Sequence, residues 1–369
     1  MATDGTNDAA RVERPVMRQP RGGPLRAWLE LVRLPNVFTA AADILLGYFF
    51  THPLDALADS WPVLLLLIVA SAAIYTAGMA LNDYFDRQVD ARLRPTRPIP
   101  SGRVSAVSAA RLGWSLLAIG FVAAAVAGLW WARLDAGPQS DVIETTALLD
   151  KPAGAPDAGD ASIAIHPPFA TWRPALIAAL LIASVVGYDA LLKRTPLGPL
   201  AMGACRFFNV LLGMSLAAGS FHRVHYAVAA GIGIYIVGVT WFARREAIVG
   251  RRLELALALI VMLCGLALLG WFPSLVDDQL PEVSQPVFTT PGRWRLLMAL
   301  LGSVIAWRVI GAVVDPQPAL VQMAVRQCII SLVILDASAC FVVRGLPAAT
   351  IILVLLAPLL MLQQWFSST

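Results

Sequence analysis

Long apolar runs dominate this chain and restrict what it can fold into. Ten such segments lie near residues 34–51, 61–81, 107–131, 172–190, 198–217, 225–243, 253–272, 294–314, 322–343 and 347–366. Most are close to the ~20 residues that an α-helix needs to cross a bilayer, where backbone groups must be hydrogen-bonded internally. We therefore predict an all-α polytopic transmembrane bundle. It has nine or ten helices, because the ninth segment contains Gln322, Arg326, Gln327 and Asp336.

The composition agrees with a membrane protein. Hydrophobic residues make up 58% of the chain and charged residues 14%, whereas about 25% of an average soluble domain is charged. The net charge of +4 arises from basic residues in short loops, so membrane orientation explains it and we predict no nucleic-acid partner. All four cysteines lie in apolar segments without CxxC spacing, which predicts neither a disulfide framework nor a zinc site.

The charge of the connecting loops alternates along the chain. The loops 83–106, 191–197 and 244–252 are basic, and the intervening loops 133–171 and 274–292 are acidic. Because loops rich in Lys and Arg stay on the cytoplasmic side, we predict a cell (inner) membrane protein with a cytoplasmic N-terminus. Residues 1–27 are predicted to be a disordered basic cytoplasmic tail, and residues 28–366 the transmembrane domain. The loop 133–171 is predicted to be long, acidic and extracytoplasmic, and no role for it follows from the sequence.

The stretch Asn82–Asp90 carries the most distinctive chemistry. It places three aspartates and one asparagine within nine residues, at the end of the second apolar segment. On a helix, Asn82, Asp86 and Asp90 share one face, about 6 Å apart along the axis. Carboxylates crowded at a membrane boundary repel each other and are costly to desolvate, so a cation is expected there. We predict Mg²⁺, a hard ion that takes oxygen ligands and shares them with substrate phosphates.

Basic residues follow on the same side of the membrane. Arg97 lies in the loop after the motif, and Lys193 and Arg194 follow Tyr188 after the fourth segment. Carboxylates for Mg²⁺ beside Lys and Arg for phosphate oxygens suit a diphosphate, and apolar helices around them suit a hydrocarbon tail. The expected ligand is therefore a lipid diphosphate. Lys193 and Arg194 also fit a positive-inside anchor, and both roles can hold together.

These motifs resemble a known family. Asn82–Asp90 is similar to the NDxxDxxxD motif of the UbiA superfamily of intramembrane prenyltransferases, and Arg97–Gly102 resembles its usual continuation. Tyr188–Arg194 resembles the family's Tyr-x-x-x-Leu-Lys-Arg stretch, and Arg33–Asn36 its entry into the first span. The resemblance covers roughly residues 28–366. Among subgroups, the chain looks similar to the UbiA-like members that bacterial ebo gene clusters encode.

The resemblance implies a reaction and roles for individual residues. An allylic prenyl diphosphate binds with Mg²⁺ and ionises, and an aromatic or lipid-like acceptor captures the allylic cation within the membrane. Asp86, Asp90, Lys193 and Tyr188 are the implied catalytic residues, Tyr188 lining the cation site. Asn82, Asp83, Asp86 and Asp90 are the implied metal ligands. The implied diphosphate ligands are Arg97, Lys193, Arg194 and Arg245.

One departure from the family leaves alternatives open. A second aspartate-rich motif is expected after the sixth span, but the loop Arg244–Arg252 holds one carboxylate, Glu246, among four arginines. Arginines including Arg245 can replace a second metal ion as diphosphate ligands. Alternatively, ionisation is lost and the protein binds or transports a prenyl lipid without transferring it. A scaffold subunit is a third alternative, although that role needs no aspartates in ligand register.

Several polar residues lie inside the apolar segments. They are Asp43, Arg206, Asn209, Arg308 and Asp336. Ionisable groups within a membrane face the bundle interior and pair with one another, or they mark a functional site. We expect Asp43 to be the partner of Arg206. The acceptor, the prenyl chain length and the oligomeric state do not follow from the sequence.

Overall fold

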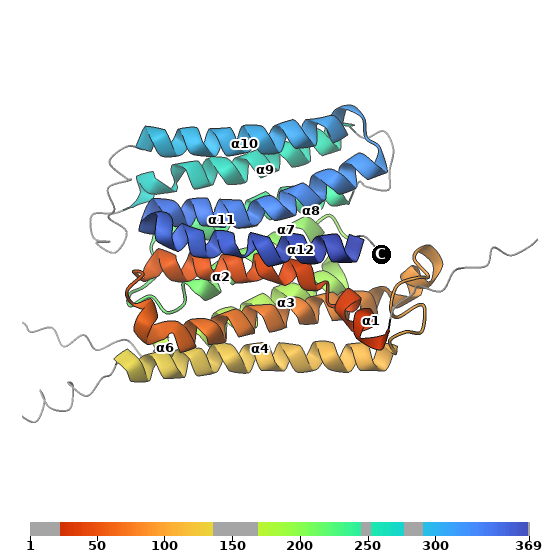
Figure 1. Cartoon of the computed structure of the whole chain (residues 1–369), viewed down its shortest axis with the longest axis horizontal. Helices are drawn as coiled ribbons and strands as arrows, with labels where there is room; N and C mark the ends of the chain where they lie inside the picture. Colours follow the sequence, from red (N-terminus) through yellow and green to blue (C-terminus); the bar gives the residue numbers. More distant parts are fainter. Residues whose placement is uncertain (1–22, 136–168, 245–251, 277–290, 368–369) are drawn as a thin grey trace, which may run out of the picture.

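The computed structural model describes residues 23–135, 169–244, 252–276 and 291–367, and within these ranges every regular element is helical (Figure 1). The elements are α1 (Pro24–Leu31), η1 (Leu34–Asn36), α2 (Val37–Thr51), α3 (Leu57–Leu93), α4 (Ala106–Asp135), α6 (Phe169–Gly187), η2 (Tyr188–Leu192), α7 (Gly198–Gly213), α8 (Arg223–Ala243), α9 (Arg252–Trp271), η3 (Phe272–Leu275), α10 (Pro291–Val314), α11 (Pro318–Val354) and α12 (Leu356–Ser367). The long helices run side by side along one axis (Figure 1).

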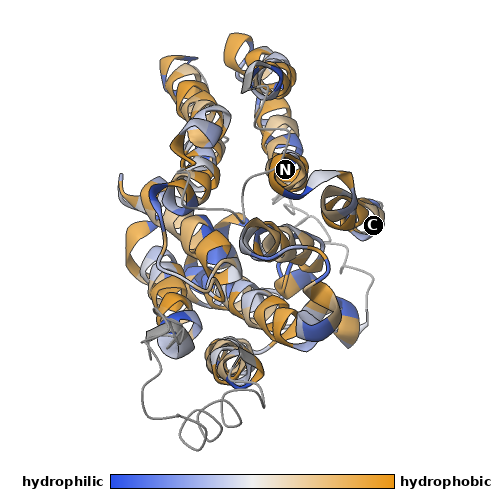
Figure 2. Cartoon of the chain, turned by 90° about the vertical axis from the view of Figure 1, so that its left-hand side faces the viewer, coloured by the Kyte–Doolittle hydropathy of each residue, from blue (hydrophilic) through white to orange (hydrophobic). Residues whose placement is uncertain are grey.

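The helices form a multi-pass membrane bundle. Among the described residues, eight helical stretches are long and apolar enough to cross a bilayer. Figure 2 looks along the helices and shows apolar residues on their outward faces as well as between them. Trp307 of α10, for example, exposes 82% of its surface. In water such faces would drive aggregation, whereas in a bilayer they contact lipid.

The last two predicted segments form a helical hairpin that the count of eight treats as one stretch. Gly345 interrupts α11 with φ of +77°, a left-handed conformation that glycine adopts without strain. The chain then runs back along the first arm. The two arms are in contact where Arg326 Nε donates a hydrogen bond to Gln363 Oε1 at 3.1 Å. With α7 and both arms of this hairpin included, all ten predicted segments are helical in the described part of the chain.

Two boundaries differ from the prediction. The helix of the second segment continues to Leu93, so the Asn82–Asp90 motif lies on α3 and not in a loop. Helix α1 includes residues 24–27, which we predicted to belong to a disordered tail. Residues 1–22, most of the loop 133–171, and Arg245 and Glu246 lie outside the described residues.

Helix α2 lies in the core of the bundle and packs against α3, α7 and α11. Gly47 of α2 and Gly213 of α7 face each other so closely that a Cβ on either would clash with the opposite backbone. This approach brings Asp43 of α2 next to Arg206 and Asn209 of α7. At one end of the bundle, α3 and η2 lie side by side. We call this the motif end.

Candidate active site

Lys193 connects the first two oxygens of the motif. Its Nζ lies 3.1 Å from Asn82 Oδ1 and 2.7 Å from Asp86 Oδ2. Arg194 adds a contact of 3.2 Å between its Nη2 and Asp86 Oδ1. The side chain of Lys193 is 12% exposed and that of Arg194 is 65% exposed. The sheltered lysine therefore forms the stronger contact, since exposed ion pairs contribute little.

Arg97 connects the other two carboxylates. Its Nη1 donates to Asp83 Oδ1 at 3.1 Å and to Asp90 Oδ2 at 2.7 Å, and both aspartates are buried. Arg33 approaches Asp83 Oδ1 with its Nη2 at 3.5 Å. Within the described ranges, Arg33 is also the one non-glycine residue with a positive φ, at 47°. Such a strained conformation needs support from its surroundings and often occurs at functional sites.

Local structure explains why Arg97 reaches back to the motif. Helix α3 ends at Leu93, two residues before Pro95, whose ring disfavours helical geometry in the preceding residue. The chain then folds into a tight turn, in which the Ser101 amide donates to the Arg97 carbonyl at 3.0 Å. Arg103 Nη2 donates to the Thr96 carbonyl at 2.9 Å and holds this turn from its far side.

Lys193 is positioned by a π-helical turn and by Arg244. The turn η2 ends where the Lys193 amide donates to the Tyr188 carbonyl at 2.9 Å. Arg244, at the end of α8, donates from Nη1 to the Thr195 carbonyl at 2.7 Å and from Nη2 to the Lys193 carbonyl. A Cβ on Gly198 would clash with the Arg244 guanidinium, so glycine is needed for this close approach.

The oxygens of the motif can hold a divalent cation only if a bound molecule, such as a phosphate, supplies further oxygens. They form two pairs, Asn82 with Asp86 and Asp83 with Asp90, each bridged by a cationic nitrogen. In the described part of the chain, no three His, Cys, Asp or Glu side chains lie close enough to hold a metal alone. The four predicted ligands therefore do not meet at one point, since eight helical residues span about 12 Å. Mg²⁺ commonly takes one or two carboxylates and completes its shell with phosphates and water, which this donor set allows.

A small cavity lies one helical turn deeper than Asn82, between α3, α6, η2 and α7. Its volume is about 70 Å³, and Gly78, Tyr188, Asp189, Arg206 and Asn209 are among the residues that line it. That volume has room for a few water molecules or one small group. In this conformation the cavity admits a reacting group but not a whole prenyl chain.

Behind this cavity lies a buried polar cluster. Arg206 Nη1 donates to Asp43 Oδ2 at 2.9 Å, which confirms the expected pair. Asn209 Nδ2 donates to the same oxygen at 2.8 Å, and Ser71 Oγ donates to Asn209 Oδ1 at 2.7 Å. Asp336 of α11 lies beside Asp43 and is fully buried, yet neither of its oxygens accepts a hydrogen bond from a described residue. Asp43 and Arg206 thus have a structural role in joining α2 to α7.

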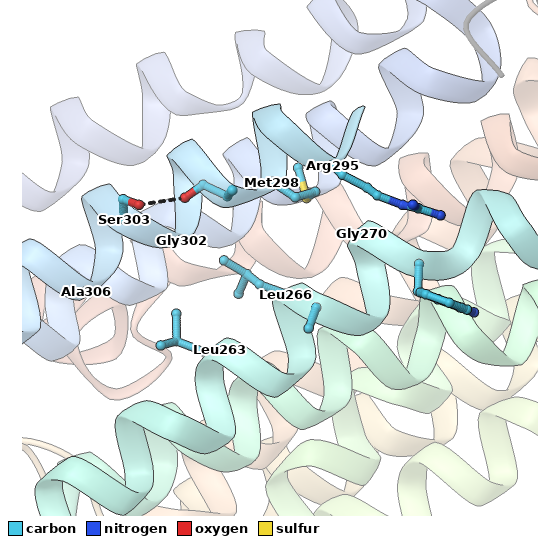
Figure 3. Close-up of a pocket in the computed structure, with 11 residues that line it drawn as sticks. Leu263, Leu266, Gly270, Arg295, Met298, Gly302, Ser303 and Ala306 are labelled. Carbon is cyan, nitrogen blue, oxygen red and sulfur yellow. Dashed lines mark hydrogen bonds between the residues drawn. The ribbon is translucent and has the colours of Figure 1, made fainter. Parts of the chain in front are cut away.

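A larger groove lies between α9 and α10, away from the motif (Figure 3). It has a volume of about 390 Å³ and is lined by side chains such as Leu266 and Met298. Arg295 is its one charged lining residue, and Ser303 Oγ donates to the carbonyl of Ala299 in its own helix at 2.8 Å. Without a carboxylate or a second cation, this groove is not suited to diphosphate chemistry.

Sequence comparison now bears on the motif itself. Residues 44–135 match the UbiA prenyltransferase family, a span that includes Asn82, Asp86, Asp90 and Arg97. The resemblance to the UbiA superfamily is confirmed. Two relatives are digeranylgeranylglyceryl phosphate synthases, from Ignicoccus hospitalis and Methanopyrus kandleri. They are 39% and 42% identical over 98 and 97 residues, which cover 27% and 26% of this chain and 30% and 34% of theirs. The chain thus spans about a third of the length of these curated relatives.

The UbiA fold extends over most of the chain. A solved UbiA homologue from Archaeoglobus fulgidus, bound to GPP and Mg²⁺, matches with a TM-score of 0.52 at 12% identity. The match covers 86% of this chain and 99% of that one. At such low identity the likeness concerns the fold alone, because one fold hosts different functions. It confirms the predicted UbiA-like helical bundle.

The structure brings most predicted site residues together. Asn82, Asp83, Asp86, Asp90, Arg97, Lys193 and Arg194 lie in the two ion-pair groups at the motif end. Tyr188 lines the small cavity, and Arg245 lies outside the described residues. Sequence reasoning assigned no role to Asp189 or Arg33, and it considered Arg244 only among the loop arginines that can bind diphosphate. Asp189 gave one signal, a carboxylate inside an apolar segment beside a motif tyrosine.

Proposed function

We propose that this protein transfers a prenyl group from an allylic prenyl diphosphate to an aromatic or lipid-like acceptor within the membrane. The observation that carries the proposal is the meeting of Lys193 and Arg97 with the two oxygen pairs of the motif. Carboxylates and cations in one place suit Mg²⁺ and diphosphate together. The UbiA match over the motif, and relatives named as synthases of a prenylated glyceryl phosphate, support this function.

Some of these residues would bind the metal ion, and others would bind the diphosphate leaving group. Oxygens from the pairs Asn82 with Asp86 and Asp83 with Asp90 would hold Mg²⁺ together with the diphosphate. When bound, the ion would neutralise charge on the diphosphate and favour its departure. Lys193, Arg194 and Arg97 now contact these carboxylates, and on binding they donate hydrogen bonds to diphosphate oxygens instead. Tyr188 lines the neighbouring cavity, where its ring can stabilise an allylic cation.

The same proposal includes the orientation in a cell (inner) membrane. Arg94, Arg97 and Arg103 lie in the short connection after α3, and Lys193 and Arg194 in the one after η2. Both connections are at the motif end, so the positive-inside rule puts this end in the cytoplasm. A diphosphate made in the cytoplasm then reaches the motif without crossing the membrane.

The acceptor is the least specified part of the proposal. The relatives are named for a product with two geranylgeranyl groups on glyceryl phosphate, which implies transfer to a lipid that already carries one. Geranylgeranylglyceryl phosphate is therefore the first acceptor to test. A simple phenol such as 4-hydroxybenzoate represents the aromatic alternative.

The test measures prenyl transfer by the purified protein in nanodiscs, with labelled geranylgeranyl diphosphate and these two acceptors. We expect a labelled product with Mg²⁺ and none with EDTA. Asp86→Ala should abolish transfer, because Asp86 holds the sheltered contact to Lys193. Asp59→Asn changes an exposed carboxylate at the opposite end of α3 and should have no effect. Full activity in Asp86→Ala would rule out the assignment, and binding without turnover would favour a non-catalytic prenyl-lipid binding or transport protein.

A further inference from the structure

Asp189 is a buried carboxylate in η2, outside the two ion-pair groups of the motif end. It is 4% exposed and lines the small cavity beside Tyr188. The other lining residues include no glutamate, histidine or lysine, so Asp189 is the cavity's one side chain suited to accept a proton at neutral pH. We propose that Asp189 is the catalytic base that removes the acceptor's proton, an inference that rests on the proposed prenyl transfer.

The backbone positions this carboxylate towards the motif. Asp189 lies in η2, a π-helical turn, and such distortions are frequent at functional sites. Across the cavity, a Cβ added to Gly78 would lie 3.8 Å from Asp189 Oδ2. Gly78 precedes Asn82 by one helical turn of α3. The carboxylate therefore faces the space between the ion-pair groups and the apolar interior, where C1 of a bound prenyl group is expected.

No neighbouring donor occupies Asp189. Lys193, one turn later in the chain, directs its ammonium to Asn82 and Asp86. Among the residues that the structure describes, none donates a hydrogen bond to the Asp189 carboxylate. Because Asp189 lines the cavity, a group that enters the cavity can reach its carboxylate. An acceptor hydroxyl in the cavity would supply the missing hydrogen bond.

The transfer needs such a base. The bond between C1 and the diphosphate oxygen breaks, and the diphosphate leaves with the electron pair. A bond forms between C1 and the oxygen or ring carbon of the acceptor, and that atom then loses its proton to Asp189. Hydrogen bonds from Lys193, Arg194 and Arg97 would occupy the oxygens of the released diphosphate and lower its basicity, which leaves Asp189 to take the proton. Asp189 returns the proton to water when the product leaves.

The experiment compares Asp189→Asn and Asp189→Glu with wild type and with Asp59→Asn. It uses geranylgeranyl diphosphate, with either geranylgeranylglyceryl phosphate or 4-hydroxybenzoate as acceptor. Two readouts are followed, prenylated product and exchange of ¹⁸O between the bridging and non-bridging positions of the diphosphate, which reports ionisation alone. We expect Asp189→Asn to form product about 10²-fold more slowly, the contribution typical of a general base. Isotope exchange should persist, and Asp189→Glu should recover part of the product formation.

The contrary outcomes are distinct. An equal loss of isotope exchange and product in Asp189→Asn would assign Asp189 a structural role and overturn the proposal. Product formation at the wild-type rate would mean that diphosphate or water takes the proton, which also overturns it. If the wild-type protein shows neither product nor exchange with Mg²⁺, the proposed function fails first, and this inference fails with it.

Discussion

Replacing Asp43 by asparagine should destabilise this protein far more than the same change at Asp336. Both carboxyl groups are fully buried in the core of the bundle. Asp43 Oδ2 accepts hydrogen bonds from Arg206 Nη1 at 2.9 Å and from Asn209 Nδ2 at 2.8 Å. Asp336 accepts none from a described residue. The two aspartates are thus equally buried, but of the two it is Asp43 that is hydrogen-bonded to Arg206 and Asn209.

The magnitude follows from the partner that remains. Without the Asp43 carboxylate, the guanidinium of Arg206, whose side chain is 12% exposed, retains its bond to Thr39 Oγ1 but loses the charged partner that it contacts at 2.9 Å. Leaving one partner of a buried ion pair uncompensated costs about 3–5 kcal/mol. In Asp336→Asn the bonds from Arg206 and Asn209 to Asp43 remain, and the new amide can still donate a hydrogen bond to Asp43 beside it. We expect a change within about 1 kcal/mol of zero, or a gain in stability.

The assay is unfolding in mixed detergent micelles, followed by helical circular dichroism as the denaturing detergent increases. The free energy of unfolding should fall by about 3–5 kcal/mol in Asp43→Asn and stay near the wild-type value in Asp336→Asn. Equal losses in both variants would refute the reasoning, because they would show that the Arg206 pair has no special part in holding α2 to α7.

Three further predictions concern the hairpin turn at Gly345 and two arginines of the candidate site, Arg244 and Arg97. Gly345→Ala should lower the free energy of unfolding by about 1–3 kcal/mol, because φ of +77° with ψ of −170° is open essentially to glycine alone. Gly311→Ala on the open face of α10 should not destabilise. Arg244→Leu should raise KM for the prenyl diphosphate about tenfold in steady-state assays, since losing its bonds to Thr195 and Lys193 loosens the Lys193 turn. Arg97→Gln should lower both the melting temperature and the affinity for prenyl diphosphate, measured by calorimetry, because Asp83 and Asp90 lose their shared partner. An unchanged KM in Arg244→Leu, or unchanged stability and affinity in Arg97→Gln, would contradict the role assigned to that arginine.

The membrane bundle and part of the site could be predicted from the sequence, because they depend on local pattern. The length of an apolar run sets whether a helix crosses a bilayer, and all ten predicted segments are helical in the described residues. The spacing of Asn82 and Asp86 placed them on one helical face, where Lys193 now bridges them. The pairing of Asp43 with Arg206 followed from the cost of isolated charges in a membrane.

Other features depend on contacts between distant segments and could not be predicted. Hydropathy ends near residue 81, but Asn82–Leu93 contains no proline or glycine, so α3 continues as a helix through the motif. The separation of Asp83 and Asp90 from the other pair depends on Arg97, which returns from a tight turn. The direction of Asp189 depends on the π-helical turn, which hydrophobic periodicity does not reveal.

The central claim of the proposed function is that this protein ionises a prenyl diphosphate. Its most direct test is diphosphate release by the wild-type protein from labelled farnesyl and geranylgeranyl diphosphates, with and without Mg²⁺, in the presence of acceptor. The proposed function predicts release that requires Mg²⁺ and disappears in Asp86→Ala. Saturable binding of either prenyl diphosphate with no diphosphate release at any Mg²⁺ concentration would contradict it.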